Sequence, residues 1–321
     1  MHKEHFVTLF DESYLPLGLA LYESLCAHAR PFHLWVLTMD EAAEKHLQRL
    51  ALPELTPLPL HEVETPALRA IKHSRSHAEY CLTLTPFVFA PVFARAIKAA
   101  RVTYLDADVY LFDDPRLLLR ELEESHRQIL MTEHAFGAGY DREAVAGRFC
   151  VQFLTCVRSP HAAHVLHWWQ ERCLEACPVP ARDGKFGDQK YLDEWPVRFA
   201  EAIHIVKQTH QTLAPWNVNH FARLFAGPLR PVMYHFHAFR LLNAHRARLH
   251  RGYRVGREAR QLYRTYLEAV GRAVERLHAA QIAVRPMHLP VESFRLLRKW
   301  RRVLSGEERY AQIPRHAKPP E

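Results

Sequence analysis

Two aspartates, Asp106 and Asp108, are the residues whose types and spacing point most directly to chemistry. They follow the apolar segment VTYL, residues 102–105, which is typical of a buried β-strand. In an extended chain, residues i and i+2 point the same way, so both carboxylates can reach one cation. Hard divalent ions favour carboxylate oxygens and keep other positions for water or phosphate. The pair therefore predicts a metal ion that bridges the protein and a diphosphate and acts as a Lewis acid.

The elements expected around this pair would place it at the edge of a sheet. Strand patterns occupy residues 5–10, 32–37, 102–105, 128–131, 149–157 and 232–237. Helical patterns occupy residues 15–28, 160–177 and 257–280. The βαβ alternation of the first half predicts a mixed, mainly parallel sheet in an α/β domain, and ligands bind at the carboxyl ends of such strands. The chain ends in a basic helix and a polar tail, and we expect the tail to fray.

The composition limits the classes of function that are open to the chain. Its 321 residues are 48% hydrophobic and 24% charged, which excludes disorder as the main state. The motifs GxGxxG, GxxxxGK[ST], GxSxG, HExxH and CxxC are absent, which argues against the dinucleotide, P-loop, serine-hydrolase, zinc-protease and thioredoxin-like classes. The net charge of +8 fits an acidic small molecule or an anionic membrane surface, and we expect no nucleic-acid partner. No secretory segment follows Met1, so we expect a cytoplasmic protein.

Several segments together resemble a known family. They are FVTLFDESYLPLGLALYESL at residues 6–25, VTYLDADVY at 102–110, GKFGDQKYLDEWP at 184–196, APWNVN at 214–219 and YHFHAF at 234–239. In this order they resemble the retaining nucleotide-sugar glycosyltransferases of family 8 and their bacterial relatives. The resemblance implies a single Rossmann-like nucleotide-diphospho-sugar transferase domain over residues 1–251. Its nucleotide-binding half would span residues 1–132 and its sugar and acceptor half residues 133–251, with a helical extension over residues 252–321.

The resemblance also implies roles for particular residues. Asp106 would contact the ribose and the metal, Asp108 would be the main metal ligand, and His235 would be the third ligand. An imidazole beside two carboxylates suits Mn²⁺ better than Mg²⁺, which remains the alternative cofactor. Asp188 and Gln189 would lie at the donor sugar as the catalytic pair.

The remaining nucleotide contacts implied by the resemblance come from four residues. Asp11 and Tyr14 would meet uracil and ribose, and Arg75 and Arg240 would meet the diphosphate. Asn217 is a candidate for approaching the acceptor, whereas Trp216 is expected to be packing.

Competing interpretations of these residues stay open at this point. Asp188 could instead cap a helix, and we expect His237 to be an ordinary core histidine. His73 and His77 stand four residues apart, and a solvated helix face is the preferred interpretation of them. Cys150 and Gln152 stand where many family members carry Asn-x-Gly, which leaves the identity of the sugar open. Two other functions are retained. VTYLDADVY and the segment from Gly187 and Asp188 to Asp193 also resemble the first and last acidic motifs of haloacid-dehalogenase-like phosphatases. The departures at Cys150 and Gln152 leave open a sugar-nucleotide-binding protein that has lost catalysis.

The function that the resemblance favours is transfer of a hexose from a UDP-sugar to an acceptor hydroxyl, with retention of configuration by a front-face mechanism. The acceptor would be a glycan or a lipid-linked molecule in surface polysaccharide or lipopolysaccharide synthesis. Residues 292–304 form a basic amphipathic pattern with Trp300 on its apolar side. This pattern is expected either to pack on the domain or to hold the enzyme peripherally on an anionic membrane surface.

Overall fold

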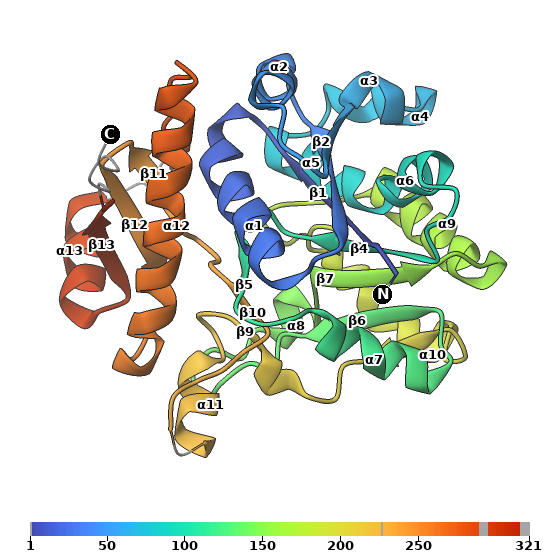
Figure 1. Cartoon of the computed structure of the whole chain (residues 1–321). Helices are drawn as coiled ribbons and strands as arrows, with labels where there is room; N and C mark the ends of the chain where they lie inside the picture. The colour runs from blue at the N-terminus through green and yellow to red at the C-terminus, as the bar shows by residue number, and fades with distance from the viewer. Residues whose placement is uncertain (1, 226, 289–294, 315–321) are drawn as a thin grey trace.

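A seven-stranded sheet with the strand order β3-β2-β1-β4-β7-β6-β8 forms the centre of the protein (Figure 1). The structure is a computed structural model that describes residues 2–225, 227–288 and 295–314. Strand β7 runs antiparallel to its neighbours β4 and β6, and the other neighbouring pairs are parallel. The expected mixed, mainly parallel sheet is therefore confirmed. The strands are β1 Glu4–Phe10, β2 Phe32–Thr38, β3 Leu55–Pro59, β4 Arg101–Leu105, β6 Ile129–Glu133, β7 Phe149–Val157 and β8 Ile203–Ile205.

Helices cover both faces of this sheet because its strands are apolar on both sides. Along β6, Ile129 and Met131 face one hydrophobic cluster and Leu130 faces the other, as the period of two in a strand requires. The first cluster includes side chains of α3 Leu60–Val63, α4 Pro66–Lys72, α5 His77–Leu84, α6 Phe89–Arg95, α9 Pro160–Glu175 and α10 Trp195–Arg198. The second includes side chains of α1 Leu15–His28, α2 Glu41–Leu50, α7 Arg116–Ser125 and α12 Arg260–Ala279.

A small second sheet closes the molecule beyond the carboxyl end of β4. Strand β10 lies between β5 and β9 and is antiparallel to β5. In this register His235 is paired with Val109, the residue that follows Asp108. The elements of this region are β5 Val109–Leu111, α8 Glu143–Ala146, β9 Thr212–Leu213, α11 Val218–Leu224 and β10 Met233–His235.

The C-terminal segment contains a strand as well as the expected helices. Helix α12 packs against α1, and α13 Arg295–Ser305 follows it. Strand β13 Glu308–Gln312 then pairs antiparallel with β12 Arg246–Arg251, which also pairs with β11 Arg240–Asn243. The predicted fraying of the tail is therefore wrong over residues 308–312. The strand is held there by Glu308, which is 3% exposed and accepts hydrogen bonds from Tyr310 and Arg302.

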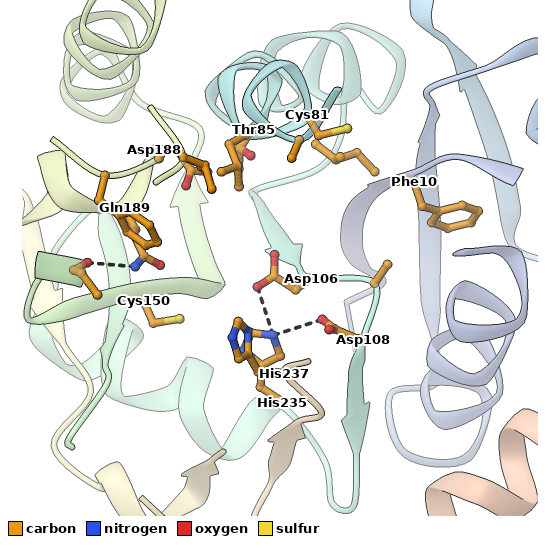
Figure 2. Close-up of a pocket in the computed structure, with 18 of the residues that line it drawn as sticks. Phe10, Cys81, Thr85, Asp106, Asp108, Cys150, Asp188, Gln189, His235 and His237 are labelled. Atoms are coloured by element: carbon orange, nitrogen blue, oxygen red, sulfur yellow. Dashed lines mark hydrogen bonds and ion pairs between the residues drawn. The ribbon is translucent and has the colours of Figure 1, made fainter. Parts of the chain in front are cut away.

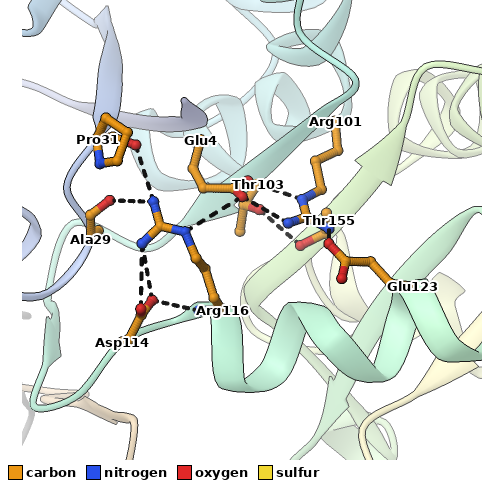
Figure 3. A network of polar contacts seen from close by, with 9 residues as sticks. All are labelled: Glu4, Ala29, Pro31, Arg101, Thr103, Asp114, Arg116, Glu123 and Thr155. Atoms are coloured by element: carbon orange, nitrogen blue, oxygen red, sulfur yellow. Dashed lines mark hydrogen bonds and ion pairs between the residues drawn. The ribbon is translucent and has the colours of Figure 1, made fainter. Parts of the chain in front are cut away.

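A network of charges fixes the opposite, amino-terminal end of the central strands (Figure 3). The Arg101 guanidinium makes two hydrogen bonds of 2.9 and 2.7 Å to the buried Glu4 carboxylate, from Nε and Nη2, and joins β4 to β1. Nη2 of Arg116 donates to the carbonyls of Ala29 and Pro31 and so ties the start of α7 to the α1–β2 loop. This network aligns β1 and β4, whose other ends lie at the candidate site.

Candidate functional site

A cavity of about 490 Å³ opens at the carboxyl ends of β1 and β4. Its wall includes residues from both halves of the chain, and Figure 2 shows the polar ones converging from different elements. Nearly all of the site residues expected from the sequence line it. They are Asp11, Tyr14, Asp106, Asp108, Asp188, Gln189, His235 and Arg240.

Asp106 and Asp108 lie on a tight turn between β4 and β5 rather than on an extended strand. The Val109 amide donates a 3.0 Å hydrogen bond to the Asp106 carbonyl and closes this turn. Both carboxylates nevertheless approach one imidazole: Nε2 of His235 lies 3.0 Å from Oδ1 of Asp108 and 3.6 Å from Oδ2 of Asp106 (Figure 2). The sequence prediction of a shared cation site is therefore matched by the geometry, although the backbone achieves it differently.

The pairing of β10 with β5 brings His235 to the acidic pair. The Phe236 amide donates a 2.8 Å hydrogen bond to the carbonyl of Asp108, so the backbone ladder continues to the site itself. Ligand atoms of the three side chains all lie within 4.8 Å of one another. Two carboxylates and an imidazole are donors that suit a first-row divalent ion such as Mn²⁺, so these residues fit the metal that the resemblance implies.

The electrostatics of the three side chains reflect their burial and their mutual contacts. Burial favours the neutral form of Asp108, but His235 outweighs it and holds the pKa of Asp108 at about 2. Burial likewise opposes protonation of His235, yet Asp108 and Asp106 raise the pKa of this histidine well above 6.5. The pKa of Asp106 is raised, mainly because it is buried.

Asp188 lies across the cavity, at the start of a short 3-10 helix over residues 189–194, and makes no capping hydrogen bond with its side chain. The alternative of a capping role for Asp188 is therefore not supported. The side chain is 3% exposed, and burial raises the pKa of its carboxyl to about 7. The neighbouring Gln189 donates a 2.8 Å hydrogen bond from Nε2 to the carbonyl of Ala146. Both side chains are thus placed on the cavity wall facing the Asp106 side (Figure 2).

Asp11 and Tyr14 line the end of the cavity beside β1. Oδ1 of Asp11 accepts hydrogen bonds from the amides of Ser13 and Tyr14, which fixes the turn after the strand. Its other oxygen lies 2.9 Å from Nε2 of His77. The guanidinium of Arg240 lies 5.6 Å from the centre of the Tyr14 ring, so a cation and an aromatic face meet at this end.

Two residues that the sequence analysis proposed for the site instead hold the backbone of the fold through hydrogen bonds. Arg75 donates to the carbonyls of Cys173 at 2.6 Å and Leu174 at 2.5 Å, and it does not line the cavity. The interpretation of Arg75 as a diphosphate ligand is therefore wrong in this structure. Asn217 is fully buried, and its amide bonds the backbone of Ala214 and His134.

Four residues to which the sequence analysis gave no role in the site also line the cavity. His237 is exposed in its wall, so the prediction of a core histidine is wrong. Trp216 and His134 also line it, and Trp216 donates from Nε1 to the His134 carbonyl at 2.8 Å. His77 lines it too, and its hydrogen bond with Asp11 raises its pKa to about 10. The side chain of His77 is 62% exposed, as a solvated helix face requires, but it also pairs with Asp11, which lies 66 residues away in the chain.

Comparison with known proteins agrees with this fold. No protein-family model matches the chain. It is 28% identical to the uncharacterized protein YfnD of Bacillus subtilis strain 168, over 86% of this chain and 91% of YfnD. It is 27% identical to YfnF of the same strain, over 74% of this chain and 82% of YfnF. Among solved structures, the glycosyltransferase GlyE of Streptococcus pneumoniae TIGR4 superposes with a TM-score of 0.51 and 16% identity. The match covers 90% of this chain and 66% of GlyE.

The chain therefore shares the Rossmann-like fold of GlyE, and its cavity contains an Asp-Asp-His group. This is the fold that the sequence resemblance implied. The alternative of a haloacid-dehalogenase-like phosphatase would use Asp188 and Asp193 as its last acidic motif, and only Asp188 lines the cavity. In the structure, Asp193 accepts hydrogen bonds from the Arg148 amide and from Lys190, and it does not line the cavity.

Proposed function

We propose that the protein is a metal-dependent glycosyltransferase that moves a hexose from a UDP-sugar to an acceptor hydroxyl. The observation that carries this proposal is the convergence of Asp106, Asp108 and His235 in the cavity at the carboxyl end of β4. That edge is where ligands bind in open α/β sheets. The glycosyltransferase fold of GlyE supports the same class of reaction.

In this proposal, some residues of the cavity contact the diphosphate of the donor and others contact its sugar. A bound Mn²⁺ would neutralise charge on the departing diphosphate as a Lewis acid. Arg240, beside Tyr14, is placed to add a positive charge at the same end of the cavity. Asp188 and Gln189, which line the opposite wall, would bond the hydroxyl groups of the donor sugar. Of the described carboxylates on the wall, Asp106 and Asp108 would hold the metal, Asp11 is held by His77, and Asp188 is assigned to the sugar hydroxyls, so this proposal assigns none of them as a nucleophile. We therefore favour a front-face, retaining mechanism in which the leaving phosphate oxygen accepts the acceptor proton.

Aromatic side chains form another part of the wall, where an acceptor would bind. Trp216 packs edge-on against His134 and lies 6.1 Å from the Tyr253 ring, centre to centre. Phe136 stacks on His134 at 4.6 Å. Faces of this kind suit the apolar faces of sugar rings, so a glycan or a lipid-linked glycan is the proposed acceptor, as in surface polysaccharide or lipopolysaccharide synthesis.

Helix α13 is the proposed contact with an anionic membrane surface. Trp300 is 64% exposed and Leu304 83% exposed, so neither of them packs on the domain. Lys299 and Arg301 are exposed beside them. Apolar and cationic side chains on one short helix fit the interface of an anionic bilayer, and Trp suits the headgroup region. Among the described helices, none is long and apolar enough to cross a bilayer. The remaining predicted apolar positions, Phe294 and Leu297, lie outside the described side chains.

The proposal is tested by calorimetry of UDP binding with and without Mn²⁺. We expect tight binding only with Mn²⁺ in the wild type, and loss of that dependence in Asp108→Asn. Asp113→Asn is the matched control because Asp113 is an exposed aspartate a few residues away that does not line the cavity. Equal UDP affinity with and without Mn²⁺ in the wild type would contradict the proposal.

Product analysis separates the alternatives. Mn²⁺-dependent hydrolysis of one UDP-sugar in a panel would identify the donor and support an enzyme. Mn²⁺-dependent UDP binding with no turnover of any hexose donor would favour the sugar-nucleotide-binding protein that has lost catalysis.

A further inference from the structure

Gln152 is a fully buried amide on β7 that contacts two of the strands around the candidate metal site. Its side-chain Oε1 lies 2.9 Å from Nδ1 of His235. Its main-chain carbonyl accepts a 3.3 Å hydrogen bond from the amide of Asp106. One residue therefore contacts a histidine and an aspartate of the site, which come from different elements of the chain.

The direction of the Gln152 amide follows from its second contact. Its Nε2 lies 3.5 Å from Oγ1 of Thr132, and the hydroxyl proton of Thr132 is already donated to the Cys150 carbonyl at 3.2 Å. A hydroxyl has a single proton to give, so Oγ1 can only accept from Gln152. The amide nitrogen thus points to Thr132 and the amide oxygen to His235. This assignment rests on the hydrogen-bond network, as amide orientations generally do.

The orientation decides which nitrogen of His235 would keep its proton when a cation binds. An amide oxygen only accepts, so Nδ1 of His235 must donate to it. Nε2 is the nitrogen that faces Asp108 and Asp106, at 3.0 and 3.6 Å. A histidine binds a metal through the nitrogen that lacks a proton, and the bond made by its other nitrogen fixes the tautomer.

We propose that Gln152 is a positioning residue, which holds the His235 ring and its Nδ1 proton so that Nε2 is presented to a divalent cation. The inference rests on the proposed function for the presence of that cation. It adds a residue outside the cavity lining, in the segment where this chain departs from the Asn-x-Gly of many family members. It also accounts for a polar side chain in the fully buried part of β7, where an unpaired amide would be costly.

The test compares direct Mn²⁺ binding in three variants, measured by the electron paramagnetic resonance signal of free Mn²⁺. Gln152→Met keeps the length of the side chain and removes the acceptor, and we expect Mn²⁺ affinity to fall about 10- to 100-fold. Gln152→Glu keeps an acceptor oxygen, and we expect affinity equal to or tighter than the wild type. Thr155→Val removes the buried Thr155–Thr103 hydrogen bond of the same strand, away from His235, and we expect unchanged affinity.

If Gln152→Met does not fold, a measurement on the wild-type protein still tests the inference. In ¹⁵N spectra of the protein with diamagnetic Zn²⁺, the His235 resonances are assigned by their loss in His235→Asn. We expect the ring proton on Nδ1, and a proton on Nε2 would overturn the inference.

The outcomes also separate this inference from the proposed function. Unchanged Mn²⁺ affinity in folded Gln152→Met, or an equal loss in Thr155→Val, overturns the positioning role alone. A wild type that binds no Mn²⁺ overturns the metal-dependent function and this inference with it.

Discussion

Burial of the Asp188 carboxyl reduces the stability of the folded protein as the pH approaches neutrality. It is 3% exposed, and burial raises its pKa from 3.8 to about 7. Between these two values the folded state binds a proton that the unfolded state does not. The stabilisation is therefore fully present below about pH 4 and is lost as the pH rises toward 7, in protein without ligands.

Replacing Asp188 by Asn should remove this pH dependence. We expect the melting temperature of Asp188→Asn to rise relative to that of the wild type between pH 5 and pH 8. Only the wild type loses stability as this carboxyl ionises, and each unit of pKa difference corresponds to about 1.4 kcal/mol. Thermal unfolding of the metal-free proteins measures it, with Asp183→Asn, an exposed aspartate of the same loop, as the control. A constant difference across this pH range would contradict the prediction. Sugar transfer should fall strongly in Asp188→Asn while UDP binding stays near the wild type.

At the scale of elements, the alignment of β1 with β4 depends on the Arg101–Glu4 pair. Arg101→Met leaves the Glu4 carboxylate buried without its main partner, which should cost about 3 kcal/mol of stability. Urea unfolding measures this cost. Arg127→Met breaks a pair with Glu201, whose side chain is 95% exposed, and should cost less than about 1 kcal/mol. Similar losses in the two variants would mean that the buried pair has no special role.

Elements with a strong local pattern were predicted from the sequence almost to the residue. Helix α1 and strand β7 have the predicted bounds, residues 15–28 and 149–157, since apolar residues run through both. Strand β13 was missed because its sequence, ERYAQ, is polar and its strand character comes from pairing with β12. The three candidate metal ligands were predicted because Asp106 and Asp108 form a motif and the family resemblance points to His235. Arg75 was misplaced because its partners, the carbonyls at 173 and 174, lie about a hundred residues away.

At the scale of the whole molecule, we expect the exposed side of α13 to bind anionic membranes. Trp300→Ser combined with Leu304→Ser should reduce sedimentation with anionic vesicles and leave UDP binding unchanged. Wild-type binding should weaken as salt rises, since surface charges are screened, and neutral vesicles should not bind. Val197→Ser, at another exposed apolar residue, is the control.

Point substitutions test this better than removal of the tail. Truncation before α13 would also remove β13, and with it Glu308, whose carboxylate lies 3.9 Å from the buried Arg248. Undiminished binding of the double variant to anionic vesicles would refute α13 as the contact surface.

The pairing of β5 with β10 has a consequence for how the site comes into being during synthesis. Asp106 and Asp108 leave the ribosome long before His235, which is paired with Val109 only after more than a hundred further residues have been made. At about 5–20 residues per second, this interval lasts on the order of ten seconds. A nascent chain that stops before β10 can thus carry both carboxylates, yet it lacks the imidazole that completes the group. The three side chains can therefore hold a cation together only late in synthesis, after β10 has paired with β5.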